Sequence, residues 1–166
     1  MDLERRLFVR VNEAPDWRWL RVPQQLGTPW ALPAASAVLA LSGRRSRAAA
    51  ALLTLPVVKG VEVAVKETVR RPRPLYRVPT ELRDDAPVEG GSFPSGHVAL
   101  SAAATWFLQD HAPPWLAATL WASTALNAYV RVHQGAHWPT DVVAGAALGV
   151  GAAAAATAVC ERVVGQ

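Results

Sequence analysis

The sequence contains a single cysteine, Cys160, which lies in an Ala-rich run. One cysteine cannot form an intrachain disulfide, and the sequence shows no cysteine-based metal site. The charged N-terminus lacks an apolar segment followed by a cleavage site, so no secretory signal is predicted. The net charge of +4, from 17 basic and 13 acidic residues, is too small to indicate a nucleic-acid-binding protein.

The average composition conceals a segregation of charged and apolar residues. The hydrophobic fraction is 51% and the mean hydropathy is +0.14, both close to those of soluble proteins. Charge is nevertheless gathered in residues 1–21, 44–47 and 59–85, and the intervening stretches are rich in Ala, Leu and Val. Basic residues beside apolar stretches favour anionic head groups or phosphate as ligands. The length of 166 residues indicates one domain, residues 1–166.

The N-terminal segment, residues 1–27, is predicted to lie in the membrane interface. Residues 3–11 carry apolar and basic positions at helical spacing, and tryptophans and prolines follow them. Tryptophan mixed with basic residues is typical of interfacial segments. The alternative is a surface helix of a soluble domain.

Five apolar stretches are interpreted as transmembrane spans. They run over about Thr28–Leu41, Arg47–Val65, Val98–His111, Trp115–Val130 and Trp138–Cys160. Several are shorter than the ~20 residues that a lone spanning helix needs, so a compact bundle is expected. Small residues such as Gly145 and Gly149 would let helices approach closely. The predicted fold class is all-α, an integral membrane bundle of about five transmembrane helices plus the N-terminal interfacial helix.

The orientation of these spans follows from the short basic loop Gly43–Arg47, which should face the cytoplasm. Alternation of the spans then places three polar blocks on the outer face. They are Lys66–Pro74, Pro94–His97 and Arg131–Asp141. The connector Leu75–Ser92 is expected to be an outer loop that acts as a lid, a substrate guide or a plain linker.

The first two blocks contain groups that bind phosphate. Lys66 is a compact point charge, and Arg73 is a planar fork that matches two phosphate oxygens. The neighbouring Arg70 and Arg71 could be mistaken for that ligand or hold anionic head groups. Ser95, Gly96 and His97 open a helix, where free backbone N–H groups face anions. His97 could there donate a proton to a leaving oxygen.

The third block contains Arg131, His137 and Asp141. His137 and Asp141 are four residues apart and would lie close to one face of a helix that starts near Pro139. A carboxylate bonded to one ring nitrogen of His137 fixes the tautomer and leaves the other nitrogen free to attack. Arg131 can reach the same phosphoryl group. Each block alone has a plausible structural explanation, but their combination favours phosphoryl transfer.

The three blocks together resemble the signature of the type 2 phosphatidic acid phosphatase superfamily. They match it as Lys66-x6-Arg73-Pro74, Pro94-Ser95-Gly96-His97 and Arg131-x5-His137-x3-Asp141. The resemblance covers about residues 66–149, the predicted catalytic core. It implies a helical bundle and phosphate hydrolysis through a phosphohistidine, without a metal or cofactor.

On that pattern His137 would be the nucleophile, Asp141 its orienting partner, and His97 the group that protonates the leaving group and later activates water. The phosphate oxygens would be held by Lys66, Arg73, Arg131, the Ser95 hydroxyl and the Gly96 N–H.

The chain departs from the family pattern in two respects. Members commonly have six spans, and five are predicted here. Lys59 and Glu62 lie inside a span, where charges are usually paired. Their spacing predicts ion pairs that lead towards Lys66 and either position it or hold the bundle together. His133 has no role in the signature and is expected to lie in a loop or behind the site.

The predicted function is that of a lipid phosphatase in the bacterial plasma membrane, with its active site on the outer face and the bilayer and a lipid phosphate as partners. Undecaprenyl or decaprenyl diphosphate, or a related polyprenyl-linked phosphate, is the expected substrate. Phosphatidylglycerophosphate and phosphatidic acid are alternatives. Two further hypotheses are a soluble member of the superfamily, such as an acid phosphatase or a vanadium-dependent haloperoxidase, and a catalytically silent membrane protein that binds lipid phosphate.

Overall fold

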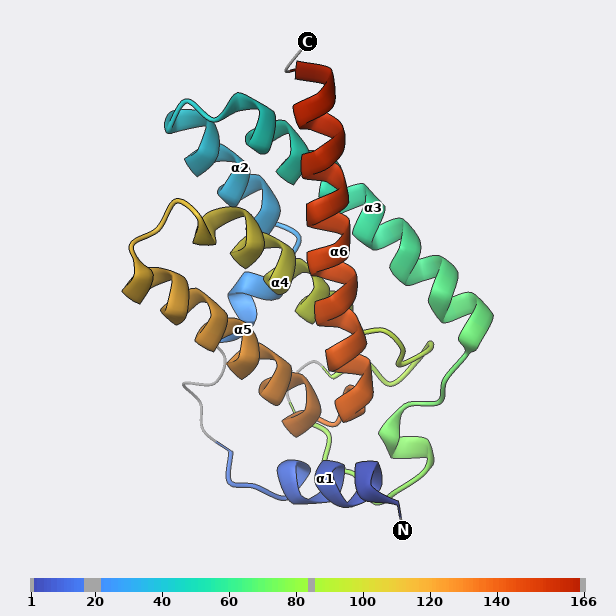
Figure 1. Ribbon diagram of the computed structural model, residues 1–166. Coiled ribbons are helices and arrows are strands. Elements are labelled where there is room, and N and C mark those ends of the chain that lie inside the picture. Colours follow the sequence, from blue (N-terminus) through green and yellow to red (C-terminus); the bar gives the residue numbers. More distant parts are fainter. Residues whose placement is uncertain (1, 17–21, 84–85, 165–166) are drawn as a thin grey trace.

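The computed structural model describes residues 2–16, 22–83 and 86–164, and all regular secondary structure in those residues is helical (Figure 1). In chain order the helices are α1 (Leu3–Asn12), η2 (Pro23–Gly27), α2 (Ala31–Leu41), α3 (Arg45–Val69), η3 (Pro74–Tyr76), α4 (Gly96–Gln109), α5 (Pro114–His133) and α6 (Pro139–Val164). The five predicted spans fall on α2 to α6, with ends shifted by a few residues. The all-α prediction is confirmed.

Prolines set the helix ends near the predicted site. Both α5 and α6 begin at a proline, Pro114 and Pro139, because proline fits the first turn of a helix. Helix α3 ends at Val69, where Arg70 adopts a left-handed conformation with φ 47° and prolines follow at 72 and 74. The last turn of α3 therefore carries Lys66 to the edge of the bundle.

Helix α4 lies at the centre of the bundle. It contacts α2, α3, α5 and α6, and most of its side chains are buried, including Leu100 and Phe107. On its α5 side the hydroxyl of Thr124 lies 2.9 Å from those of Ser101 and Thr105. Polar side chains commonly link helices in this way inside membrane bundles. Because α4 is held by its neighbours, the Ser95–His97 segment at its beginning is fixed in position.

Two glycines let α6 pack directly against the backbone of α4. A Cβ atom added at Gly145 would lie 2.4 Å from the carbonyl oxygen of Ser95, and one at Gly149 would lie 2.0 Å from that of Ala99. These distances leave no room for any side chain. The predicted close approach through small residues is present at this contact.

The outer surface of the bundle is largely apolar. Exposed large hydrophobic side chains occur along α2, α3 and α6, among them Leu41, Leu53, Val57 and Val143. Helices α3 and α6 are long and apolar enough to cross a membrane, whereas α2 is shorter. The number of spans stays a prediction.

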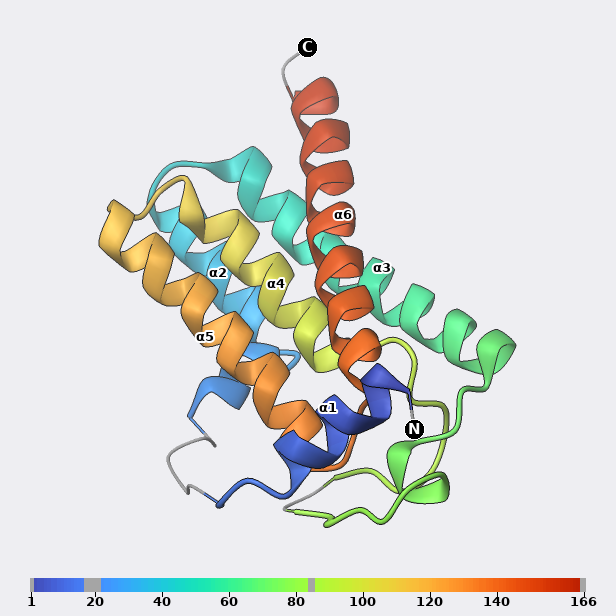
Figure 2. The same ribbon diagram turned by 60° about the horizontal axis from the view of Figure 1, so that its bottom comes forward.

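Helix α1 lies across one end of the bundle, against α5 and α6 (Figures 1 and 2). Phe8 is fully buried, with its ring centroid 5.2 Å from that of Trp138. The Asn12 side chain donates to the carbonyl oxygens of Glu81 and His133 at 2.8 and 2.9 Å. The N-terminal helix is thus present and docked, while its location in a membrane interface stays a prediction. Trp17 and Trp19 lie outside the described residues.

Candidate active site

Hydrogen bonds join the three polar blocks, and Ser92 of the connector, at the α1 end of the bundle. The Ser92 N–H donates to the Arg71 carbonyl at 2.9 Å, and the Ser95 N–H donates to the Asp141 carbonyl at 3.0 Å. The Trp138 indole Nε1 donates to the Pro72 carbonyl at 3.0 Å. Segments about 20 to 70 residues apart in sequence are therefore held together, and the three blocks lie close to one another. Their location on the outer face of a membrane stays a prediction.

His137 lies between α5 and α6 and is 2% exposed. Its Nδ1 atom is 2.7 Å from the carbonyl oxygen of Ser92. A carbonyl oxygen only accepts hydrogen bonds, so Nδ1 must carry the proton. The lone pair of the neutral ring is then on Nε2. This is the tautomer that a nucleophilic imidazole requires.

The acceptor that fixes this tautomer differs from the predicted one. The nearest carboxylate oxygen of Asp141 is 3.7 Å from the same Nδ1, beyond hydrogen-bond distance. Asp141 is fully buried and accepts instead from the Trp138 N–H at 2.8 Å and from Arg71 Nη1 at 2.6 Å. The Ser92 carbonyl therefore orients the ring, and Asp141 supplies a negative charge beside it.

Burial lowers the pKa of His137 to about 4, further lowered by the charges of Arg131 and Arg73 and opposed by Asp141. A lowered pKa means that the ring stays neutral as the pH falls through 6.5 and gains its proton only near 4. We expect ¹⁵N-histidine NMR of the protein in micelles to show a neutral Nδ1–H ring from pH 8 to pH 5. The signal is assigned by its loss in His137→Ala. A midpoint near 6.5, or the other tautomer, would contradict this geometry.

Two buried arginines lie at the site. Arg73 is 3% exposed and donates to the carbonyl oxygens of Ala136 and Glu89 at 2.7 and 2.9 Å, and its burial lowers the pKa of the guanidinium. Arg131 is 5% exposed and donates from Nη1 to the Gln134 side chain at 2.8 Å. Both cations are thus fixed in orientation before any ligand binds.

Two buried polar atoms at the site have no hydrogen-bond partner among the described residues. They are the Ser95 hydroxyl and the Nε of Arg131. Ser95 occupies the N-cap position of α4, as predicted, but its hydroxyl does not cap the helix. Leaving buried donors unpaired is costly, so such groups indicate a ligand that completes them.

The predicted ion pairs in α3 are present. Glu62 is 6% exposed, and its two carboxylate oxygens each lie 2.6 Å from a lysine Nζ, that of Lys59 and that of Lys66. The same carboxylate packs against α4, since a Cβ added at Gly96 would lie 2.2 Å from it. Glu62 thus places Lys66 beside the beginning of α4, which favours the positioning role over a purely structural one.

His97 and His133 have different surroundings. His97 is partly exposed in the first turn of α4, within electrostatic range of Arg131 and His137. His133 lies at the end of α5, where its Nε2 is 3.0 Å from the Ala14 carbonyl oxygen. His133 therefore helps to dock the N-terminal segment behind the site.

The described part of the connector between the first two blocks is attached to the same surface. Arg83 donates to the carbonyl oxygens of Asn12 and His133, and the Glu81 N–H donates to the Asn12 side chain at 2.8 Å. These contacts hold the connector against α1 and α5, which favours a role beside the site over that of a plain linker.

Comparison with known proteins supports the family that the motifs predict. The model of the PAP2 superfamily matches residues 47–163. An undecaprenyl-diphosphatase from Sulfolobus acidocaldarius is 37% identical over 71 residues, which are 43% of this chain. That alignment spans 34%, about a third, of the relative's length.

Two crystal structures share the fold. Aquifex aeolicus LpxE has a TM-score of 0.81 at 22% identity, covering 94% of this chain and 95% of that one. The first transmembrane PAP2 type phosphatidylglycerolphosphate phosphatase from Bacillus subtilis has a TM-score of 0.68 at 21% identity, covering 96% and 85%. The predicted fold class, an all-α membrane bundle, is confirmed by these likenesses. Because the family model matches well over half of its length, the chain belongs to the PAP2 superfamily.

Proposed function

We propose that the chain removes phosphate from a membrane lipid through a phosphohistidine on His137. The observation that carries the proposal is a buried imidazole whose Nδ1 faces the Ser92 carbonyl, at a site where the Ser95 hydroxyl and Arg131 Nε have no hydrogen-bond partner among the described residues. A phosphate group supplies acceptor oxygens for both. The fixed cations Arg73 and Arg131 match the charge that develops during transfer.

The reaction proceeds in two displacements. The Nε2 lone pair of His137 attacks phosphorus, an N–P bond forms, and the bond from phosphorus to the leaving oxygen breaks. Burial and the charge of Arg131 lower the pKa of His97 to about 4 in the ligand-free protein, so His97 gains its proton when the anionic phosphate binds beside it and then gives that proton to the leaving oxygen. In the second step neutral His97 takes a proton from water, the resulting hydroxide attacks phosphorus, and the N–P bond breaks to release phosphate and free His137. Asp141 stabilises the positive charge on the phosphorylated ring, whose Nδ1–H stays bonded to Ser92.

The remaining groups hold the transferred phosphoryl oxygens. Lys66, Arg73 and Arg131 contribute charge, and the Ser95 hydroxyl and the Gly96 N–H at the beginning of α4 contribute neutral donors. Glu62 neutralises Lys66 in the ligand-free site, and a bound phosphate would share that lysine with it.

A polyprenyl diphosphate is the substrate that the chain's features favour most. The local similarity to an undecaprenyl-diphosphatase supports it, as does the predicted position of the site on the outer face of a bacterial plasma membrane. Phosphatidylglycerophosphate is a second candidate, supported by the shared fold with the Bacillus subtilis phosphatase.

The test is phosphate release by the purified protein in detergent with EDTA present, comparing wild type with His137→Ala. The substrates are undecaprenyl diphosphate, phosphatidylglycerophosphate, phosphatidic acid and a water-soluble phosphomonoester. We expect metal-independent release from one lipid, highest for the diphosphate, and a loss of about 10⁴-fold or more in the variant. Equal activity in both proteins would reject the phosphohistidine on His137. No release from any substrate would favour a lipid-phosphate-binding protein.

A further inference from the structure

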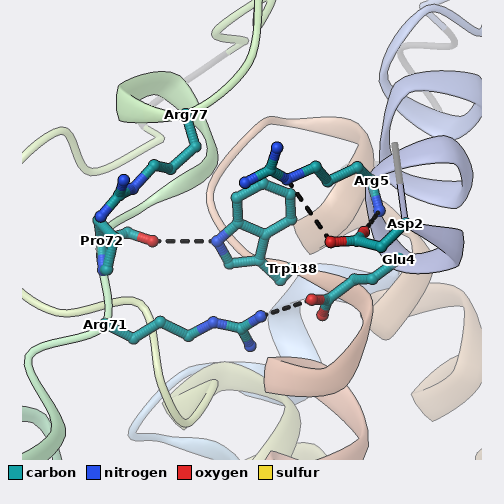
Figure 3. Close-up of a pocket in the computed structure, with 7 residues that line it drawn as sticks. All are labelled: Asp2, Glu4, Arg5, Arg71, Pro72, Arg77 and Trp138. Atoms are coloured by element: carbon teal, nitrogen blue, oxygen red, sulfur yellow. Dashed lines mark hydrogen bonds and ion pairs between the residues drawn. The ribbon is translucent and has the colours of Figure 1, made fainter.

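The N-terminal helix contributes a carboxylate to the surroundings of the active site. Glu4 of α1 lies 2.6 Å from Arg71 Nη2 (Figure 3). Its other oxygen accepts hydrogen bonds from the N–H and the hydroxyl of Thr140. Glu4 lies outside residues 47–163, the part of the chain that the family model matches. The contact therefore belongs to this chain's own N-terminal segment and not to the family's motifs.

Arg71 lies between Glu4 and Asp141, the proposed partner of the nucleophile His137. Its Nη1 lies 2.6 Å from Asp141 Oδ1, while its Nη2 contacts Glu4. The guanidinium also lies 5.6 Å from the ring centroid of Trp138, whose ring faces the small cavity drawn in Figure 3. The side chains of Arg71 and Glu4 are each 25% exposed, whereas that of Asp141 is fully buried.

We propose that Glu4 and Arg71 are positioning residues that tune the charge at His137, an inference that rests on the proposed function. The four groups form a row of alternating charge, with Glu4 negative, Arg71 positive, Asp141 negative and the phosphorylated His137 ring positive. Arg71 holds Asp141 in place by a charge-assisted hydrogen bond. Glu4 offsets the charge of Arg71, so that Asp141 can stabilise the ring when it becomes cationic.

The need for Glu4 follows from the position of Arg71. An uncompensated guanidinium on Asp141 would weaken the stabilisation that the carboxylate gives to the phosphorylated ring, because like charges separated by one group still repel at low dielectric. Substrate phosphate, in contrast, would contact Lys66, Arg73 and Arg131. Loss of Glu4 should therefore affect formation of the phosphoenzyme more than binding of the substrate.

The test uses full-length Glu4→Gln in detergent, with kcat, KM and the amount of phosphoenzyme measured by rapid acid-free quench on the best lipid substrate. We expect kcat to fall about 10-fold and phosphoenzyme to form correspondingly more slowly, with KM within about twofold of wild type. The matched control is Asp2→Asn, which removes a carboxylate two residues away that caps α1 through the Arg5 N–H. That control should retain kcat within about twofold.

The double variant Glu4→Gln/Arg71→Gln separates charge tuning from simple docking of α1. Glutamine at position 71 keeps an amide N–H that can donate to Asp141 but carries no charge. Removing both charges therefore restores the balance around Asp141 while a donor to it is kept, so we expect the double variant to be more active than Glu4→Gln alone. If Glu4 serves only to attach the helix, the second substitution will lower activity further, and the inference is rejected. It is also rejected if Glu4→Gln equals wild type while His137→Ala is inactive. If His137→Ala retains activity, the proposed function itself has failed.

Discussion

Gly149→Ala should destabilise the protein, although alanine favours helix over glycine by about 1 kcal/mol. The added Cβ would lie 2.0 Å from the carbonyl oxygen of Ala99, 2.8 Å from its carbon and 3.0 Å from its Cα. All three are backbone atoms of α4, so no side chain can move aside and the helices must separate. Overpacking of this kind costs about 1–3 kcal/mol. We expect the thermal unfolding midpoint in detergent to fall by about 5 °C or more.

Gly151→Ala is the matched control for this prediction. It lies two residues further along α6, and among the described residues no atom outside the neighbouring backbone of α6 lies within 4 Å of an added Cβ there. The higher helix propensity of alanine is then not offset by a clash, and the thermal unfolding midpoint should stay unchanged or rise slightly. The two substitutions are chemically identical, so opposite signs identify the α4–α6 contact as the cause. A midpoint unchanged in Gly149→Ala would show that α6 does not pack on α4 as described.

His97→Ala should lower turnover of a lipid phosphate by about 10²–10⁴-fold. The loss should depend on the leaving group. The alkoxide that leaves from a lipid phosphomonoester such as phosphatidylglycerophosphate needs a proton, whereas p-nitrophenyl phosphate releases a stable phenolate and a polyprenyl diphosphate releases a stable phosphate. With p-nitrophenyl phosphate we therefore expect the variant to form the phosphoenzyme readily. It should then hydrolyse that intermediate slowly, since the group that activates water is missing.

The measurement is a stopped-flow record of p-nitrophenol release by His97→Ala. A burst of about one equivalent per site followed by slow turnover is expected when the second step is rate-limiting. His133→Ala serves as the comparison, because that histidine bonds to the Ala14 carbonyl behind the site. Equal losses on lipid and aryl substrates, without a burst, would assign His97 a structural or binding role instead.

The features predictable from sequence are those that local chemistry determines. Apolar stretches located α2 to α6, and prolines marked the beginnings of α5 and α6, since proline fits the first turn of a helix. The spacing of Lys59, Glu62 and Lys66 at three and four residues predicted contacts that depend only on helical periodicity. That the three polar blocks share one site was predictable because together they resemble a known family signature.

The features that sequence did not predict depend on backbone atoms or on distant pairs. The Ser92 carbonyl accepts the hydrogen bond that orients the His137 ring. Every residue has a backbone carbonyl, so a sequence pattern does not show which one will accept such a bond. Glu4 and Arg71 are 67 residues apart in different elements, so no periodicity connects them. The cluster of three arginines gave no sign that Arg71 would pair with Asp141 and that Arg73 would be buried. The pairing of Arg71 depends on how α1 and α6 pack together.

The contact of Gly145 and Gly149 with α4 also bears on how the enzyme would respond to its bilayer. Helices meet a change in membrane thickness mainly by tilting, and independent tilts would change the separation of groups at their ends. His97 lies at the start of α4 and Asp141 at the start of α6, and these two helices are in backbone contact along this side. A thinner or thicker membrane would therefore tilt the two helices together. The distance between His97, the proposed proton donor, and His137, the proposed nucleophile just before α6, would then change little with the lipid composition of the membrane.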